Sequence, residues 1–289
     1  MNSSMKIGIF DSGLGGLVVM KAIRKAMPEY DYVYLGDTKR VPYGNRSHDA
    51  VYEFTKEAVE YLFKKEDCAI VIIACNTASA RALRRLQEEY LPQFISPRIP
   101  RLKGEGGIRK ILGVLIPSAE EAGKYEKVGV IATRGTIASN TFIEEIKKVN
   151  KTSKVFQNSA PMLVPLIEEG ENKMATPFIQ EYLKPLLAKK IDALVLGCTH
   201  YPILKSQIKK EIKKLLSSHK SDLWPVKIIS QDEIVPKKLK EYFARHPEIE
   251  KNLSKKGSAK ILVTDITQTV EKLSEKWFGE DVRPRLVQL

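Results

Sequence analysis

The chain has 289 residues, of which 43% are hydrophobic and 29% are charged, and its formal net charge is +13. This length can form one large α/β domain or two smaller ones, and the composition excludes wholesale disorder. No run of about 18 apolar residues is present, and residues 1–6 lack the basic and then apolar pattern of a signal peptide. We therefore expect a folded cytoplasmic protein without a membrane segment.

Short apolar stretches rich in β-branched residues alternate with longer stretches of helical periodicity. This alternation predicts βαβ units, and hence an α/β fold of mainly parallel sheets flanked by helices. In chain order, the predicted strands are residues 6–10, 32–35, 69–74, 127–132, 193–197, 226–229 and 261–263. The predicted helices between them include residues 49–64, 78–90, 140–149 and 174–189.

Two pairs of segments repeat at an offset of about 120 residues. Residues 6–13 resemble residues 127–134, and residues 71–77 resemble residues 194–200. We therefore predict two pseudo-symmetric domains, each with a strand that ends in cysteine, and a ligand in the cleft between them. We assign residues 1–98 and 211–289 to the first domain and residues 99–210 to the second. Residues 91–107, rich in proline, glycine and basic side chains, are predicted to form a linker.

The positive charge is concentrated in residues 203–260, which hold about twice as many basic as acidic residues. A basic surface is typical of nucleic-acid binding. However, Lys209, Lys210, Lys213 and Lys214 surround apolar residues at helical spacing, which favours the solvated face of an amphipathic helix. The pattern argues against a nucleic-acid partner.

The three cysteines are Cys68, Cys75 and Cys198. An odd number without an export signal predicts free thiols, and the lack of clustered Cys or His partners predicts no metal site. Taken alone, Cys75 or Cys198 is better explained as a small buried residue that ends a core strand. Duplicated positions reverse this interpretation, because each precedes a predicted helix, whose N-terminus stabilises a thiolate. Cys68 lacks the motif and is predicted to be structural.

Two symmetric thiols fit racemisation, which removes a proton from one face of an α-carbon and returns one to the other face. That reaction needs an acid/base on each side. Asp11, at the start of the glycine-rich turn 11–16, is either an N-cap or a group that acts on a substrate ammonium or Cys75. His200 can orient or deprotonate Cys198. Pro42-Tyr43-Gly44 has the composition of an ordinary turn, and Glu168 suits a cap or a solvent-facing position equally well.

Taken together and in order, these motifs resemble the glutamate racemases of the aspartate/glutamate racemase superfamily. The resemblance spans nearly the whole chain. It implies two α/β domains with the active site between them, no pyridoxal phosphate, other cofactor or metal, a homodimer, and supply of D-glutamate for bacterial peptidoglycan. The motifs are Asp11-Ser12-Gly-x-Gly-Gly, Pro42-Tyr43-Gly44, Cys75-Asn76-Thr77, Val164-Pro-Leu-Ile-Glu168 and Leu196-Gly-Cys198-Thr199-His200-Tyr-Pro202.

The resemblance also implies residue roles. Cys75 would act on the α-proton of D-glutamate and Cys198 on that of L-glutamate. Asp11 would assist the first thiol, and His200 and Glu168 the second. The residues expected to hold the substrate ammonium and carboxylates are Asp11, Ser12, Tyr43, Gly44, Asn76, Thr77, Thr136, Thr199 and His200.

The sequence departs from the family pattern at three places. Residues 158–161 lack the cysteine that often precedes this proline, Ser118 replaces a usual glycine, and the segment 96–110 is longer than expected. Two alternatives remain open at this point. One is a related two-cysteine racemase for aspartate or another small acid, and the other is a non-catalytic basic binding protein on a racemase-like scaffold.

Overall fold

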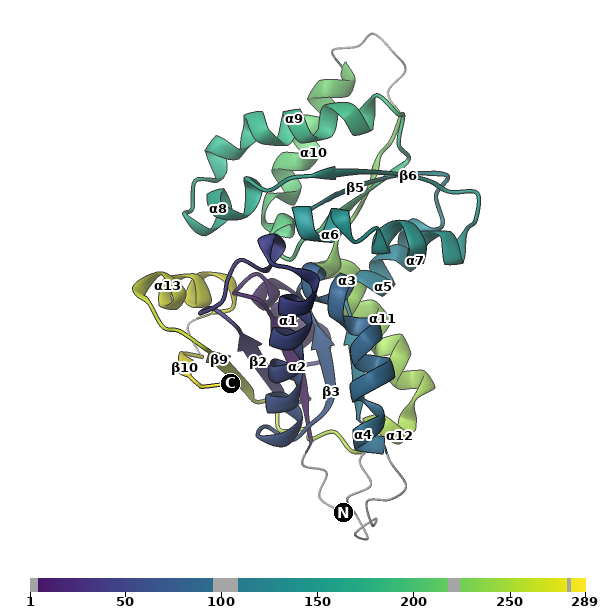
Figure 1. The fold of residues 1–289 in the computed structure, drawn as a ribbon. Helices are drawn as coiled ribbons and strands as arrows, with labels where there is room; N and C mark the ends of the chain where they lie inside the picture. Colours follow the sequence, from purple (N-terminus) through teal and green to yellow (C-terminus); the bar gives the residue numbers. More distant parts are fainter. Residues whose placement is uncertain (1–4, 96–108, 218–223, 280–281) are drawn as a thin grey trace. The chain divides into compact units, whose positions relative to one another are not determined.

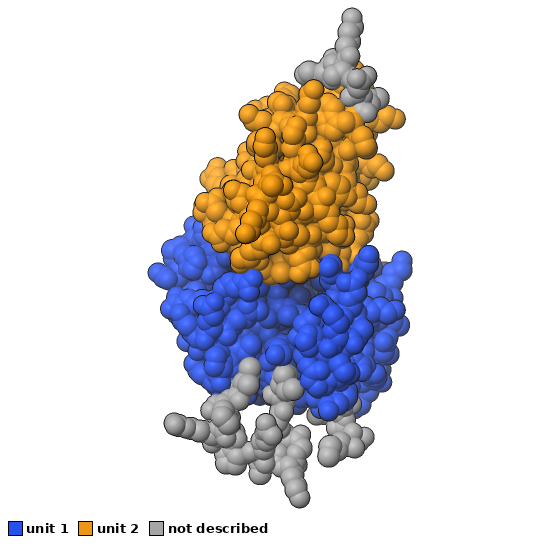
Figure 2. Space-filling view, turned by 90° about the vertical axis from the view of Figure 1, so that its right-hand side faces the viewer, with its two compact units in different colours: residues 1–114, 235–289 blue, residues 115–234 orange. Residues whose placement is uncertain are grey.

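The computed structural model describes residues 5–95, 109–217, 224–279 and 282–289. The chain divides into two compact units, coloured separately in Figure 2. Unit 1 comprises Met1–Val114 and Val235–Leu289, and unit 2 comprises Leu115–Ile234. Among the helices of the described ranges, none combines the length and the apolar character that a bilayer span requires.

Unit 1 is built on a six-stranded parallel sheet in the order β10-β9-β2-β1-β3-β4 (Figure 1). The inner strands β1, β2 and β3 are almost wholly buried, as expected where helices cover both faces of a parallel sheet. The strands are β1 (Lys6–Asp11), β2 (Tyr32–Gly36), β3 (Cys68–Ile73), β4 (Lys110–Gly113), β9 (Ala259–Val263) and β10 (Pro284–Leu286).

The helices of unit 1 pack in two pairs, α1 with α13 and α2 with α3. The chain moves across the sheet in one direction from β1 to β2 and in the opposite direction from β2 to β3. Because both parallel connections are right-handed, α1 and α2 cover opposite faces of the sheet. The elements are α1 (Gly16–Ala26), η1 (Tyr43–Asn45), α2 (His48–Lys64), α3 (Asn76–Arg85), η2 (Leu86–Tyr90), α4 (Pro92–Ile95), α12 (Pro247–Glu250) and α13 (Gln268–Trp277). Helix α11 (Gln231–Arg245) begins in unit 2 and continues in unit 1.

Unit 2 is built on a four-stranded parallel sheet in the order β6-β5-β7-β8. Its strands are β5 (Lys127–Ala132), β6 (Lys154–Ser159), β7 (Ala193–Gly197) and β8 (Lys227–Ile229). Helices α9 and α10 lie on one face of this sheet, and α5 and α7 on the other (Figure 1). The helical elements are α5 (Leu115–Ala122), α6 (Arg134–Ala138), α7 (Thr141–Val149), α8 (Leu163–Glu168), η3 (Asn172–Met174), α9 (Ala175–Leu187), η4 (Tyr201–Leu204) and α10 (Lys205–Ser217).

The predicted α/β class and the internal repeat are confirmed. The order β2-β1-β3-β4 within the first sheet corresponds strand by strand to the order β6-β5-β7-β8 of the second. The first pair of repeated sequence segments therefore contains β1 and β5, and the second pair contains β3 and β7. These are the central strands of each sheet, whose burial on both faces favours continuous apolar runs.

The unit boundaries differ from those expected from the sequence. Residues 211–234, expected in the first domain, belong to unit 2, because α10 continues to Ser217 and β8 pairs with β7. Residues 109–114, expected in the second domain, belong to unit 1, where β4 pairs with β3. Helical periodicity and short apolar runs predict the type of an element, but not the sheet edge at which it pairs. Most of the expected linker lies outside the described residues.

Three strands were not predicted: β4, β6 and β10. Strand β6 is an edge strand of intermediate burial with polar residues, so it lacks a continuous apolar run. Strand β10 has only three residues and also lies at an edge. The basic helix was predicted correctly, because α10 buries Ile208 and Ile212 and exposes Lys209, Lys210, Lys213 and Lys214.

Candidate active site

Each sheet has a topological switch point, where the chain leaves a central strand first to one side and later to the other. In unit 1 this point lies between β1 and β3, and in unit 2 between β5 and β7. Open α/β sheets bind ligands in the crevice outside the carboxyl ends of such strands. Asp11 ends β1 and Cys75 follows β3, while Cys198 follows β7. Each motif cysteine thus lies at the switch point of its own sheet.

Cys75 is the N-cap residue of α3. Its Sγ accepts a hydrogen bond from the backbone N–H of Ala78 at 3.5 Å, as a capping side chain does. The hydroxyl of Ser12 donates a second hydrogen bond to Cys75 Sγ at 3.2 Å. Both contacts favour negative charge on the sulfur. The Ser12 contact was not predicted, because Ser12 and Cys75 lie far apart in the sequence and no local pattern links them.

Asp11 lies beside the segment that carries Cys75. An added Cβ at Gly16 would be 2.7 Å from Asp11 Cβ and 3.1 Å from Ala74 Cβ, so both side chains border the same point. The carboxylate accepts a hydrogen bond from Gly13 N at 3.0 Å, which shapes the glycine-rich turn. The N-cap of α1 is Gly15, so Asp11 does not cap that helix. The structure therefore excludes the interpretation of Asp11 as an N-cap and leaves the interpretation as a functional group.

The buried side chain of Tyr34 lies close enough to this turn to be affected by its negative charges. Its hydroxyl donates to the Gly13 carbonyl at 2.8 Å. Its pKa is raised well above the ordinary value, first by burial and then by the charges of Asp11 and Cys75. The carboxylate and the thiol therefore act on one neighbouring group, although they come from different strands.

The remaining candidate residues of unit 1 surround these groups. Asn76 and Thr77 form the first turn of α3, and both are buried. Tyr43 and Gly44 lie in η1, which neighbours α3. The Tyr43 hydroxyl is directed into the unit, where it donates to Asp37. A substrate contact of Tyr43 would therefore use its backbone.

In unit 2, an imidazole links the thiol to a carboxylate. His200 Nδ1 lies 3.6 Å from Cys198 Sγ, and His200 Nε2 lies 3.0 Å from Glu168 Oε1. Cys198 and His200 are buried, and Glu168, the last residue of α8, is partly exposed. The sequence predicted a helix after Cys198, but a short 3-10 turn, η4, intervenes before α10. Beside Cys198, His200 thus has the role of charge stabilisation that the N-terminus of α3 has beside Cys75.

The electrostatics of His200 follow from its two partners. Burial by itself lowers the pKa of the imidazole. Hydrogen bonds to Cys198 and Glu168, and the negative charges of both, outweigh burial and raise the pKa to about 10. His200 is therefore an imidazolium near neutral pH. In that form it stabilises negative charge on the Cys198 sulfur and can return a proton to it.

Two threonines follow the carboxyl ends of strands in the second sheet. Thr136, fully buried in α6, has its Oγ1 3.0 Å from Thr133 Oγ1, and Thr133 caps α6. Thr199 is buried between Cys198 and His200 in the sequence. Both positions follow the carboxyl ends of central strands, β5 for Thr136 and β7 for Thr199.

Cys68 is separated from these groups. It begins β3, at the opposite end of the strand from Cys75, and is fully buried. Burial raises its pKa, which keeps the thiol protonated. Among the described residues, no three His, Cys, Asp or Glu side chains form a group that could hold a metal ion.

The sequence and the fold are similar to those of known proteins. The family described as Asp/Glu/Hydantoin racemase matches residues 17–220. The glutamate racemase of Sulfurihydrogenibium sp. is 38% identical, over 99% of this chain and 98% of the relative, and that of Aquifex aeolicus is 38% identical, over 98% and 97%. The crystal structure of the Francisella tularensis glutamate racemase in complex with D-glutamate superposes with a TM-score of 0.81 at 30% identity, covering 99% of this chain and 98% of that one.

Proposed function

The chain belongs to the glutamate racemases of the Asp/Glu/Hydantoin racemase family, and we propose that Cys75 and Cys198 together interconvert L-glutamate and D-glutamate. The observation that carries this proposal is the duplicated switch point, with one cysteine in each sheet. Each cysteine also has its own polar partners. Two thiols with separate supporting groups suit a reaction that needs an acid/base on each face of one carbon.

The chemistry proceeds by transfer of one proton from each side. In the L-to-D direction, the Cys198 thiolate takes the α-proton, and the electron pair of the C–H bond delocalises into the adjacent carboxylate. The Cys75 thiol then delivers its proton to the opposite face. The D-to-L direction exchanges the two roles. These steps employ only side chains of the chain, with one sulfur for each face of the α-carbon.

The two thiols are supported by different means. The N-terminus of α3 and the Ser12 hydroxyl stabilise negative charge on Cys75. Asp11 would receive the substrate ammonium. His200 and Glu168 stabilise negative charge on Cys198. Both arrangements oppose the cost of charging a buried sulfur.

The substrate contacts complete the proposal. Asn76, Thr77, Thr136 and Thr199 would donate hydrogen bonds to the two carboxylates of glutamate, together with the backbone of Tyr43 and Gly44. The Ser12 oxygen, whose proton is donated to Cys75, would accept a hydrogen bond from the substrate ammonium. The free state of all three cysteines supports a reducing compartment, the cytoplasm, where D-glutamate is supplied to peptidoglycan synthesis. We retain a homodimer as an expectation from the family, which light scattering can test.

Proton exchange in deuterated water tests the reaction directly. L-glutamate and D-glutamate are incubated separately with the protein, and the α-proton is followed by NMR and the configuration by circular dichroism. A two-base enzyme yields product that carries deuterium at the α-carbon, while the remaining substrate retains its proton at early times. Exchange without inversion would contradict the two-cysteine scheme. Turnover of L-aspartate but not of glutamate would contradict the substrate.

A further inference from the structure

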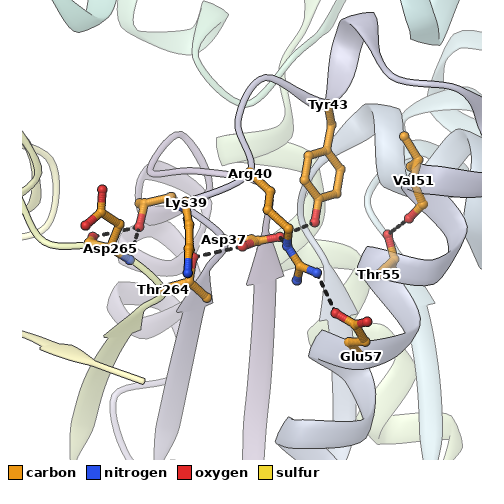
Figure 3. A network of polar contacts seen from close by, with 10 residues as sticks. Asp37, Lys39, Arg40, Tyr43, Val51, Thr55, Glu57, Thr264 and Asp265 are labelled. Carbon is orange, nitrogen blue, oxygen red and sulfur yellow. Dashed lines mark hydrogen bonds and ion pairs between the residues drawn. The ribbon is translucent and has the colours of Figure 1, made fainter. Parts of the chain in front are cut away.

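A buried carboxylate, Asp37, joins three segments of unit 1 just beyond the carboxyl end of β2 (Figure 3). Its Oδ2 accepts hydrogen bonds from the Tyr43 hydroxyl at 2.6 Å and from Arg40 Nε at 2.6 Å. Its Oδ1 accepts a hydrogen bond from the Thr264 hydroxyl at 2.8 Å. Asp37 is completely inaccessible to solvent. A buried carboxylate persists only with such partners, so this arrangement is a defined element of the fold.

The same partners hold the loop between β2 and η1 from two sides. On the β9 side, Lys39 N donates to Thr264 Oγ1 at 2.9 Å, and Thr38 exchanges hydrogen bonds with the backbone of Asp265 at 2.7 and 2.8 Å. On the α2 side, Arg40 forms an ion pair with Glu57 and lies 4.2 Å over the Phe54 ring. The loop is therefore braced between β9 and α2.

This loop contacts both the glycine-rich turn that begins at Asp11 and the turn Tyr43–Asn45, whose backbone is proposed to bind a substrate carboxylate. Asp37 N donates to the Asp11 carbonyl at 3.0 Å. At its other end, the Tyr43 ring packs against Phe10 and Phe54, with ring centroids 6.3 and 5.7 Å away. Burial and the charge of Asp37 raise the pKa of Tyr43, so its hydroxyl stays a hydrogen-bond donor. Asp37 thus contacts the segment of Asp11 through its backbone and that of Tyr43 through its side chain.

We infer that Asp37 is a positioning residue, whose carboxylate anchors the Tyr43 hydroxyl and thereby orients the backbone of the turn Tyr43–Asn45 toward a substrate carboxylate. The inference rests on the proposed function for the identity of the ligand. It assigns the Tyr43 phenol to anchoring and leaves the backbone N–H groups of the turn for binding. Asp37 itself does not touch the substrate.

A pair of matched tyrosine variants tests the anchor. Tyr43→Phe removes the hydroxyl that donates to Asp37, while Tyr30→Phe removes an equivalent one, which donates to the Glu250 carboxylate at 2.7 Å before the amino end of β2. Both changes delete one tyrosine hydrogen bond to a carboxylate in the same unit, which is buried at Tyr43 and partly buried at Tyr30. We expect Tyr43→Phe to raise KM for both enantiomers of glutamate by about tenfold, with kcat changed by less than about threefold. Tyr30→Phe is expected to leave KM unchanged.

Variants of the other partners provide a rescue test. Thr264→Val removes the hydroxyl that donates to Asp37, while Thr264→Ser keeps it. We expect the valine variant to raise KM and the serine variant to restore the wild-type value. Asp37→Asn is expected to raise KM most, because it disturbs all three contacts. Equal KM values for Tyr43→Phe and Tyr30→Phe, or for Thr264→Val and Thr264→Ser, would overturn the inference.

Amide hydrogen exchange without substrate separates this inference from the proposed function. Faster exchange of residues 43–45 in Tyr43→Phe than in Tyr30→Phe is the expected result, whatever the ligand. If the wild-type protein exchanges no glutamate α-proton but the turn loosens as expected, the proposed function fails and the anchoring role stands. If the wild-type protein racemises glutamate and the turn is unaffected by Tyr43→Phe, only the anchoring role fails.

Discussion

The Nε2 of His200 lies 3.0 Å from the Oε1 of Glu168. The other nitrogen of the same ring faces Cys198, so the carboxylate acts on the sulfur through the imidazole. Thr77 stands in the corresponding position two residues after Cys75, and the Cys75 sulfur itself caps α3 and accepts a hydrogen bond from Ser12. The two halves of the molecule repeat the fold but not the means of charge stabilisation.

Glu168→Gln should slow racemisation by about tenfold to a hundredfold, since a charge-assisted hydrogen bond contributes about 1.5–3 kcal/mol. The equilibrium constant between enantiomers is one, so kcat/KM must fall equally in both directions. The primary isotope effect of α-deuterated L-glutamate should rise more than that of the D-enantiomer, because removal of the L-proton by Cys198 becomes slower. Steady-state kinetics on both enantiomers provide the check. Glu169→Gln, an exposed neighbour, is the control and should match the wild-type protein.

The elevated pKa of His200 predicts a pH dependence of stability. The pKa is 6.5 ordinarily and about 10 in the folded protein, so the folded state binds the proton more tightly. The stabilisation is fully present below pH 6.5 and is lost as the pH rises toward 10. The free energy of unfolding should therefore decline across this window, by at most about 1.4 kcal/mol per pH unit.

Urea denaturation at a series of pH values measures this decline. His200→Asn should remove much of it, whereas His246→Asn, at a partly exposed histidine, should retain it. An identical pH profile for the wild-type protein and His200→Asn would contradict the assignment of an imidazolium.

Cys75→Ser and Cys198→Ser should each reduce kcat by about 10²-fold or more, because a serine hydroxyl is a far weaker acid/base at this position. Cys68→Ser is the matched control. Its thiol is buried at the far end of β3, so we expect nearly normal kcat and a free energy of unfolding lower by about 1–3 kcal/mol from the buried hydroxyl. Retention of near-normal activity in either of the first two variants would refute the two-base scheme.

Gly36→Ala should disturb the turn that carries Asp11. A Cβ at Gly36 would lie 2.4 Å from the Gly13 carbonyl oxygen, a backbone atom that cannot rotate away. Relief requires β2 and the glycine-rich turn to separate, which we expect to cost about 1–3 kcal/mol of stability and to lower kcat/KM. Thermal unfolding and racemase kinetics measure the two effects. An alanine variant with wild-type stability would show that this close approach is not maintained in solution.

Several features of this protein follow from the sequence alone. Buried parallel strands require continuous apolar runs, so β1, β3, β5 and β7 are recognisable and their repetition reveals two related sheets. Cys75 and Cys198 are identifiable for the same reason, since each directly follows such a run. The roles assigned to the surrounding residues stay predictions until the kinetics are measured.

Only the tertiary structure decided which groups meet. Ser12 reaches Cys75 because β1 and β3 pair in parallel, and Asp37 reaches Thr264 because β2 pairs with β9. The same holds for the edges of the sheets, where β8 joined unit 2 against expectation. Sequence periodicity reports the burial of each segment, whereas pairing between strands distant in the chain depends on the packing of the whole unit. The sequence by itself therefore determined the two strand-end cysteines, and the fold determined the partners that surround them.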